Sequence, residues 1–456
     1  MLRFFKVNDP YRLVAIAVFL VVVRLVQNYF VQDIEYFQLK WLLLGEWLAS
    51  GFSSYSQTFD YTGPLSMALF KYLDMVFGRN LVVHHLISTS LIIYQAAIFN
   101  FLLIRNRAFD ENTYLPAFLY VVVICSIPDY HALSPQLISL TFVLLVFKNV
   151  LRRINNLVTD ELFANSGLYL GLATLFYLPS FVFFFSFLVS FVFFSSAIRR
   201  RIIIYFSSYF LVIFVAFFFY FWVNDLAIFF DSYMKNGIAF IKLKSFEWKD
   251  FLLAVGGLSF VMMISVLLSY FRGRYTIFQI KVQQVLWLLL LAGLLIFFIT
   301  PNEHLYVLVF VVPFIAFYWT HYFLLLKRRS AKTLLPYILI FGLIGLNTYN
   351  YSNVDLNNTL GAAKVEESTL LLEASLTAFR NQKIMSPCFD SLSSNRGFAQ
   401  LDFYDEALNI ERLIKKLQPS KIDGPDSLVK KIFKRFPEID SLYKFENGTQ
   451  YTRINN

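Results

Sequence analysis

Two acidic residues that could do chemistry, Asp33 and Glu35, lie directly after a long apolar run and are separated by one residue. A carboxylate at such a boundary can take a proton from a hydroxyl as a general base, or it can bind a cation. The competing interpretation is a solvated helix end, because an acid outside the hydrocarbon core carries little energetic penalty. These two residues alone do not separate the interpretations.

Further ionisable residues lie at two other boundaries. Asp129 and His131 fall in the segment IPDYHALSP (127–135), and Glu303 and His304 precede or open another apolar run. Each pair also has a structural interpretation, as a helix end with its N-cap or as an anchor at the membrane interface. If these segments share one membrane face, the bundle can gather their side chains around one pocket.

A lipid phosphate in that pocket would need cations. The candidates are Arg79, His84, His85 and Lys71, of which arginine fits phosphate geometry best. Arg24 lies about two helical turns from the outer end of the first apolar run. It either extends toward the interface or faces the bundle and pairs with an acid.

The elements that must position these residues are apolar helices. The chain has 456 residues, 58% of them hydrophobic and 15% charged, with a mean hydropathy of +0.59. Because apolar runs of about 20 residues can cross the hydrocarbon core as helices, the sequence predicts an all-α polytopic membrane protein with about 11 transmembrane helices. The predicted spans lie near 12–30, 82–104, 114–128, 136–151, 162–178, 180–198, 202–222, 251–271, 282–299, 304–325 and 334–350.

The basic residues set the predicted topology. The net charge of +10 is concentrated in short clusters between apolar runs, which indicates membrane orientation and not a nucleic-acid surface. A cytoplasmic N-terminus puts all of these clusters on the cytoplasmic side. The clusters are at 105–107, 148–153, 199–201, 271–274 and 326–329.

Two external segments are long enough to have structure of their own. Loop 31–81 has an amphipathic pattern that predicts helices in the interface plane, with tryptophans at headgroup level. The tail 351–456 is richer in charged residues and predicts a small extracytoplasmic α/β domain after a transmembrane domain at 1–350. Within this tail, we expect helices at 402–417 and 426–436 and a hairpin at 443–454 that turns at Asn447-Gly448.

Several chemistries find no support in the sequence. The two cysteines, Cys125 and Cys388, offer neither a disulfide framework nor a metal-binding spacing. The chain has no phosphate-binding G-x-x-x-x-G-K-[ST] loop and no H-E-x-x-H motif. Cytoplasmic ATP is therefore not indicated as an energy source.

The order of elements in loop 31–81 resembles the first external loop of the GT-C glycosyltransferases, most closely the branch with aminoarabinose transferases and protein O-mannosyltransferases. Asp33 and Glu35 match the acids that begin this loop, and Ala49-Ser50-Gly51 matches the end of its helix. Gly63-Pro64-Leu65 matches the turn, and Phe77-Gly78 matches the step before the second span. Two features depart from the family. Its acids are usually adjacent, and its second acid usually lies nearer to 134–136, where this chain has none.

The resemblance implies a GT-C-like fold and a glycosyltransferase that moves a sugar from a polyprenyl-phosphate donor to an acceptor on the extracytoplasmic face. It implies that Asp33 or Glu35 is the catalytic base, while membrane lipid and the lipid-linked donor are the expected partners. A divalent cation is a candidate cofactor, and no metal ligands are assigned. The low cysteine count and the lack of an obvious eukaryotic signal favour a bacterial inner membrane. The predicted substrate-binding residues are Asp129, His131, Arg79, His84, Glu303 and His304.

Two other classes of function stay open from the sequence. A transporter or flippase for a lipid-linked or small solute would have charged residues deep in several spans and interrupted helices near the midplane. The chain has few such residues, with Arg24 and Asn165 as the main candidates. A non-catalytic membrane assembly protein would tolerate substitution of Asp33 and Glu35 but be sensitive in 390–450.

Overall fold

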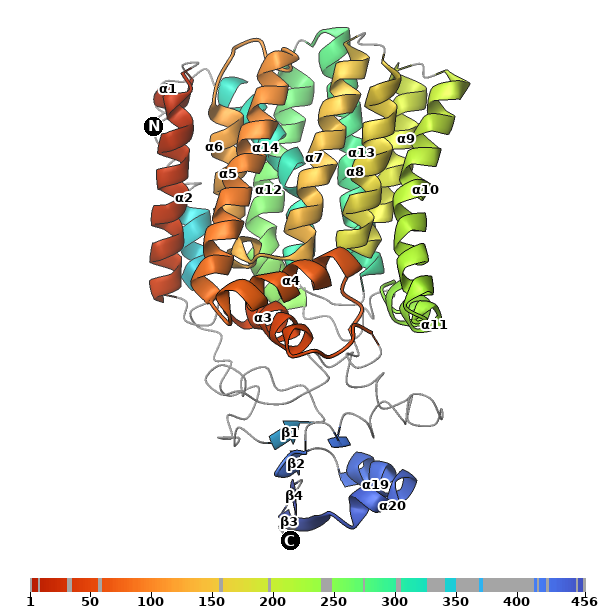
Figure 1. The fold of residues 1–456 in the computed structure, drawn as a ribbon. Coiled ribbons are helices and arrows are strands. Elements are labelled where there is room, and N and C mark those ends of the chain that lie inside the picture. Colours follow the sequence, from red (N-terminus) through yellow and green to blue (C-terminus); the bar gives the residue numbers. More distant parts are fainter. Residues whose placement is uncertain are drawn as a thin grey trace.

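The fold is a helical bundle in which each predicted apolar run contains a helix (Figure 1). The computed structural model describes residues 2–6, 9–30, 35–55, 60–155, 159–195, 198–238, 248–273, 275–300, 305–325, 341–349, 369–371, 414–415, 418–423, 426–447 and 450–453. The helices of the bundle are α2 (Tyr11–Phe30), α5 (Leu81–Arg105), α6 (Leu115–Cys125), α7 (Pro135–Ile154), α8 (Asp160–Phe176), α9 (Phe181–Ser195), α10 (Arg199–Trp222), α12 (Trp248–Arg272), α13 (Ile277–Ile299) and α14 (Val312–Leu325), with a further helix at 341–349.

By length and composition, five helices of the described chain are long and apolar enough to cross a membrane. The predicted count of about 11 spans therefore stays a prediction. The outer helices α2 and α10 expose large apolar side chains such as Val18, Leu25, Phe214 and Phe218, as expected of surfaces that contact lipid. The five helices are Tyr11–Phe30, Leu81–Arg105, Arg199–Trp222, Ile277–Ile299 and Leu305–Leu325.

Local signals in the sequence explain where several helices begin. The Asn80 side chain accepts hydrogen bonds from the backbone N–H groups of Val82 and Val83 at the start of α5. Ser134 caps α7 in the same way, and Pro135 supplies the fixed backbone angle of its first turn. The side chain of Thr276 and that of Gln279 form a capping box at α13.

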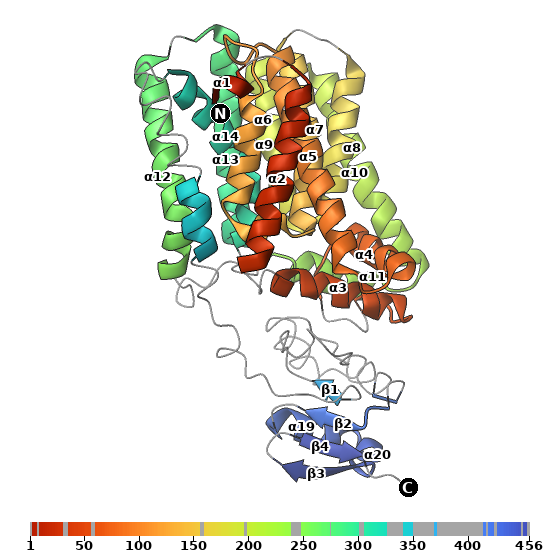
Figure 2. The ribbon, with the colours of Figure 1, turned by 90° about the vertical axis from the view of Figure 1, so that its left-hand side faces the viewer.

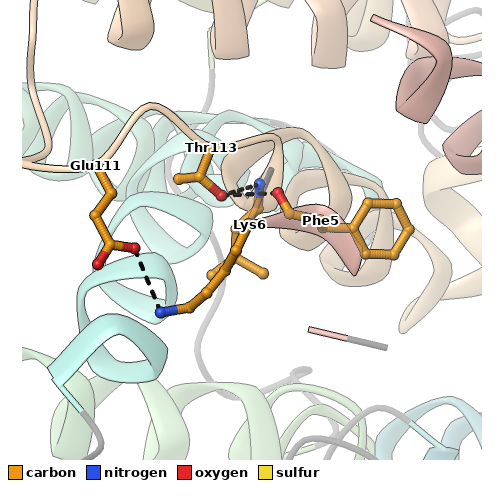
Figure 3. Close-up of polar contacts among 5 residues, drawn as sticks. Phe5, Lys6, Glu111 and Thr113 are labelled. Carbon is orange, nitrogen blue, oxygen red and sulfur yellow. Dashed lines mark hydrogen bonds and ion pairs between the residues drawn. The ribbon is translucent and has the colours of Figure 1, made fainter. Parts of the chain in front are cut away.

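The short N-terminal helix α1 (Leu2–Phe5) is tied to the loop before α6 (Figure 3). The Thr113 hydroxyl and the Tyr114 backbone N–H both donate to the Phe5 carbonyl, at 2.8 and 2.9 Å. Lys6 and Glu111 form an ion pair at 3.4 Å. These contacts hold the N-terminus at the end of the bundle opposite to α3 and α4 (Figures 1 and 2).

Two helices, α3 (Glu35–Ala49) and α4 (Pro64–Phe77), lie across the other end of the bundle (Figures 1 and 2). They pack closely at Gly45, where a Cβ would lie 2.6 Å from the Phe70 carbonyl oxygen. The prediction of helices in this loop is confirmed, and the headgroup level of its tryptophans stays a prediction. Trp41 and Trp47 are buried within the protein, and Trp41 packs against Phe70 and Tyr306.

The helix ends on this side are joined by short irregular elements. A 3₁₀ turn, η2 (Pro128–His131), joins α6 to α7, and another, η3 (Leu178–Ser180), joins α8 to α9. α11 (Leu226–Phe229) continues into a π-helical turn, η4 (Phe230–Lys235), and η5 (Leu305–Val311) leads into α14. Because successive helices alternate in direction, these connections lie at the same end of the bundle as α3 and α4.

The C-terminal region contains a four-stranded sheet in the order β1-β2-β4-β3. β2 (Lys421–Asp423) pairs parallel with β1 (Thr369–Leu371) and antiparallel with β4 (Gln450–Arg453), which also pairs antiparallel with β3 (Tyr443–Asn447). The β3–β4 pairing confirms the predicted hairpin strands, while Gly448 of its turn lies outside the described residues.

Two helices, α19 (Asp426–Arg435) and α20 (Pro437–Asp440), accompany the sheet. α19 confirms the helix predicted at 426–436 and packs Phe433 edge-on against Tyr451 of β4. Of the helix predicted at 402–417, only 414–415 falls within the described residues, and these two residues are helical. The sheet lies beyond the end of the bundle that α3 and α4 cover (Figure 1). The assignment of 351–456 as a separate domain stays a prediction.

Candidate functional site

A polar cavity lies where α3 and the turn before α4 meet the connections at the same end of the bundle. Its volume is about 30 Å³, which gives room for about two water-sized groups. It is lined by Lys40, Trp41, Tyr61, Thr62, Gly63, Pro135, Gln136, Tyr177, Leu178, Pro179, Gly237, Thr300 and Tyr306. Seven separate segments of the chain therefore line one small space, which we call the Lys40 cavity.

The charge in this cavity comes from Lys40 on α3. Its side chain is buried, and its Nζ lies 3.2 Å from Oδ1 of Asp60, which is 1% exposed. The Lys40 ammonium also lies over the Tyr61 ring, 4.8 Å from the ring centroid. A carboxylate partner stabilises the charge of a buried ammonium.

The loop before α4 holds Asp60 in place. Oδ1 of Asp60 accepts from the Tyr61 backbone N–H at 2.9 Å, and Oδ2 accepts from the Thr62 hydroxyl at 2.6 Å. The Tyr55 hydroxyl donates to the Thr62 carbonyl at 2.8 Å. Gly63 follows, and a Cβ there would lie 2.3 Å from the Leu175 carbonyl oxygen. Only glycine allows this loop to approach the end of α8 so closely, which fixes the Asp60 side of the cavity.

A chain of hydrogen bonds with a fixed direction forms another part of the lining. The Thr300 hydroxyl donates to the Ile296 carbonyl at 2.6 Å, so the Tyr177 hydroxyl must donate to Thr300, across 2.6 Å. The Gln136 side-chain amide interacts with the Tyr177 hydroxyl. Because the Tyr177 hydroxyl already donates its proton to Thr300, it can only accept from Gln136, which must donate from its NH₂ group. These three side chains line the cavity without a charge.

An apolar groove of about 240 Å³ adjoins the cavity between α8, α10 and the α11–η4 segment. Leu178 lines both spaces, and Gly237 of the cavity is followed directly by Ile238 of the groove. The Tyr233 hydroxyl donates to the Thr174 carbonyl and so fixes η4 against α8. The site thus places a polar cavity beside an apolar groove at one end of the bundle. The groove is lined by Thr174, Leu175, Leu178, Phe181, Tyr209, Phe210, Ile213, Ala216, Phe217, Phe229, Tyr233, Met234 and Ile238.

Several residues predicted from the sequence cannot be placed. Asp33, Glu303 and His304 lie outside the described residues. Glu35 is the first residue of α3, but its side chain lies outside the described part of the chain. Their predicted roles stay predictions.

Asp129 and His131 both lie in η2 and are buried. Within the described chain, neither ring nitrogen of His131 has a hydrogen-bond partner. Burial, together with the nearby Arg24 and His85, lowers the pKa of His131 well below its usual value, so the imidazole is neutral at physiological pH. η2 leads into the α7 N-terminus, whose Gln136 lines the Lys40 cavity.

The predicted cationic residues Arg79 and His84 are not among the residues that line the cavity. Arg79 lies near Glu46 of α3, with 3.8 Å between Nη1 and Oε2. The His84 ring is buried and stacks on Phe70, with 5.9 Å between ring centroids. Their substrate-binding roles stay predictions.

Most residues that line the Lys40 cavity were not predicted from the sequence. Lys40 lies in the amphipathic stretch of loop 31–81, whose pattern does not mark it as a site residue, and Asp60 lies three residues before the Gly63-Pro64-Leu65 turn. Tyr177 and Thr300 lie at helix ends and carry no motif that would mark them. Among the described residues, no three His, Cys, Asp or Glu side chains are grouped so that they could hold a metal ion.

No family model matches the sequence, and no curated protein matches it. Solved structures do match. ArnT from Cupriavidus metallidurans bound to undecaprenyl phosphate is similar with a TM-score of 0.54 at 10% identity, over 97% of this chain and 98% of that one. The apo Archaeoglobus fulgidus oligosaccharyltransferase is similar with a TM-score of 0.53 at 11% identity, over 91% of this chain and 70% of that one.

The same oligosaccharyltransferase with a tethered acceptor peptide gives a TM-score of 0.50 at 10% identity, over 98% of this chain and 74% of that one. Both neighbours are membrane glycosyltransferases of the GT-C superfamily. The resemblance noted in loop 31–81 is therefore confirmed at the level of the fold. With its apolar helices and this fold, the chain is an integral membrane protein.

Proposed function

We propose that this chain, which has the fold of the GT-C membrane glycosyltransferases, transfers a sugar from a polyprenyl-phosphate donor to an acceptor on the extracytoplasmic face of the membrane. The observation that carries the proposal is the buried Lys40 cation in a cavity that shares Leu178 with an apolar groove. A polyprenyl-phosphate sugar has the same two parts, an anionic phosphate and an apolar chain. The neighbour ArnT was solved with undecaprenyl phosphate bound, which supports this donor class.

The cavity suits the phosphate better than a whole sugar. Its volume of about 30 Å³ admits about two oxygen-sized groups. Lys40 supplies the positive charge, and a charge-assisted hydrogen bond from an ammonium to a phosphate oxygen is roughly twice as strong as a neutral one. Asp60 orients the ammonium and is itself held by Thr62 and by the backbone. The first isoprenoid units would then lie in the apolar groove.

The reaction exchanges one bond to the anomeric carbon for another. An acceptor hydroxyl oxygen forms a bond to that carbon while the bond between the carbon and the phosphate oxygen breaks. The electron pair of the broken bond stays on the leaving polyprenyl phosphate, where Lys40 stabilises the developing charge. The hydroxyl proton passes to a carboxylate, for which Asp33 and Glu35 are the candidates.

The orientation in the membrane follows from the same proposal. The N-terminus and the basic clusters lie on the cytoplasmic side, and α3, α4 and the C-terminal region lie outside. A bacterial inner membrane fits the lipid carrier and the basic clusters.

The test uses the full-length protein in lipid nanodiscs with radiolabelled undecaprenyl-phosphate sugars as donors and a membrane extract as the source of acceptor hydroxyls, and it measures release of undecaprenyl phosphate. We expect release with at least one sugar among mannose, glucose and 4-amino-4-deoxyarabinose. Asp33→Asn and Glu35→Gln, made singly, should keep the wild-type melting temperature while at least one abolishes release. Glu46→Gln, on the same helix α3, is the matched control and should remain active.

The transporter hypothesis is tested in parallel. Wild-type protein in sealed vesicles should not move the same donor between leaflets faster than empty vesicles do. Transbilayer movement without release of undecaprenyl phosphate from any of the three donors would overturn the proposed function.

A further inference from the structure

Three polar side chains from two helices hold the junction between α6 and η2. Gln27 of α2 donates from Nε2 to the Cys125 carbonyl at 2.8 Å, and the side-chain amide of Asn347 donates to the Ser126 carbonyl. Arg24 of α2 donates from Nη2 to the His131 carbonyl at 3.1 Å. All three side chains are at least 94% buried, because their exposed fractions are 6% for Arg24, 1% for Gln27 and 3% for Asn347. We call this set of contacts the Arg24 clamp.

The junction needs these donors because α6 ends inside the protein. The last carbonyls of a helix have no partner within the helix, and Pro128 cannot continue it. In apolar surroundings each unpaired carbonyl is unfavourable. Gln27 and Asn347 satisfy two such carbonyls, those of Cys125 and Ser126, and Arg24 satisfies the last carbonyl of η2.

Arg24 also binds α5. Its Nη1 donates to the His85 carbonyl at 3.0 Å, to the Ser88 hydroxyl at 2.8 Å and to the Thr89 hydroxyl. One guanidinium therefore fixes α2, α5 and η2 relative to one another. All of these acceptors are neutral, so among the described residues no carboxylate is a partner of Arg24. The prediction that Arg24 either extends outward or pairs with an acid is replaced by this third arrangement.

The two segments that the clamp joins both lead to predicted acids. α2 ends at Phe30, three residues before Asp33 in the sequence, and η2 contains Asp129. We infer that Arg24 and Gln27 are positioning residues that hold η2, which carries Asp129, in place against α2 and α5. The inference rests on the proposed function. A rotation or shift of α2 would move Asp129 relative to α5.

A matched control exists within the same bundle. Gln95 of α5 is also fully buried, donates to the Leu137 carbonyl at 2.7 Å and to the Thr141 hydroxyl at 2.8 Å, and accepts from Tyr120. It joins α5 to α6 and α7 but makes no contact with η2 among these bonds. Gln95→Leu should therefore disturb packing without moving Asp129.

The experiment compares Arg24→Gln, Arg24→Lys, Gln27→Met and Gln95→Leu in full-length protein in nanodiscs. Transfer from the donor that the wild type uses is measured as kcat and KM, and a displacement of about 1 Å at a reacting group lowers a rate about 100-fold. We expect about a 100-fold loss of kcat for Arg24→Gln with KM for the donor within about threefold, and partial recovery in Arg24→Lys. Gln95→Leu should lower the melting temperature but keep kcat.

A second measurement does not depend on transfer. Hydrogen–deuterium exchange of the peptide 126–134 should be faster in Arg24→Gln and in Gln27→Met than in the wild type, and unchanged in Gln95→Leu. Unchanged exchange in both clamp variants overturns the inference, as does a kcat loss in Gln95→Leu equal to that in Arg24→Gln. If Arg24→Gln does not fold, Gln27→Met decides both measurements. If the wild-type protein shows no transfer, the proposed function is contradicted. Hydrogen–deuterium exchange of the peptide 126–134 still decides whether the clamp positions η2.

Discussion

The Lys40 cavity and the Arg24 clamp each bury one basic side chain at the same end of the bundle, but they surround it differently. Lys40 pairs with the carboxylate of Asp60 and lines a cavity. Arg24 is surrounded by two carbonyls and two hydroxyls, which are neutral, and lines no part of that cavity. A cation beside a cavity can take an anionic ligand as an additional partner, whereas a cation enclosed by carbonyls fixes backbone geometry. We therefore assign a chemical role to Lys40 and a positioning role to Arg24.

The largest expected effect tests the chemical half of this comparison. Lys40→Met keeps the length and apolar stem of the side chain but removes the charge that would stabilise the leaving phosphate. Removal of one group that stabilises developing charge lowers rates by about 100- to 1,000-fold. We expect a loss of about 1,000-fold in kcat/KM, measured as release of undecaprenyl phosphate. Transfer at the wild-type rate would place the phosphate elsewhere.

A double variant separates this chemistry from stability. Lys40→Met alone leaves Asp60 buried without its cation, and loss of one partner of a buried ion pair destabilises a protein by about 3–5 kcal/mol. Lys40→Met combined with Asp60→Asn removes both charges, so we expect thermal stability to return to within about 1 kcal/mol of wild type. Transfer should stay as low as in Lys40→Met. Recovery of transfer in the double variant would show that the single variant was merely unstable.

The next effect concerns η2 beside the clamp. The pKa of His131 is lowered, mainly by burial, so the unfolded chain takes up a proton at pH values where the folded protein does not. Folding stability should therefore fall as the pH drops below about 6.5, the usual histidine pKa, by about 1.4 kcal/mol per pH unit from this residue. Thermal unfolding in detergent at pH 7.5, 6.5 and 5.5 measures the slope, which should be shallower by about one proton in His131→Gln. Equal slopes in both proteins would mean that His131 is protonated in the folded state.

The helices could be predicted because a segment that crosses lipid must pair its backbone N–H and C=O groups within itself, as a helix does. Runs such as 12–30, 82–104 and 202–222 became α2, α5 and α10 with small changes at their ends. The hairpin strands at 443–454 were also predictable, since the Asn447-Gly448 pair lies between two short alternating segments. In these cases a local pattern of side chains is enough to determine the local structure.

The positions of α3 and of the cavity residues could not be predicted. The tryptophan of an interfacial helix and that of a buried helix give the same pattern, and the burial of Trp41 depends on packing against Phe70 and against Tyr306 from a distant segment. In the same way, Gln136 and Thr300 are single polar residues at span ends, and no motif in the sequence marks them as site residues. Only tertiary packing brings them to Lys40.

The smallest expected effect decides between two phosphate sites. Arg79, the best phosphate ligand by residue type, lies 3.8 Å from Glu46 at the edge of α3 and α4, and both side chains are more than 20% exposed. A partly exposed, long ion pair contributes about 1 kcal/mol or less. Since Arg79 does not line the Lys40 cavity, Arg79→Gln should change the melting temperature little and keep kcat/KM within about threefold of wild type.

The same assay on Glu46→Gln gives the effect of breaking the pair from its other side. If Arg79→Gln lost as much transfer as Lys40→Met while Glu46→Gln did not, the phosphate would bind at the end of α4, and the chemical role of the Lys40 cavity would be wrong.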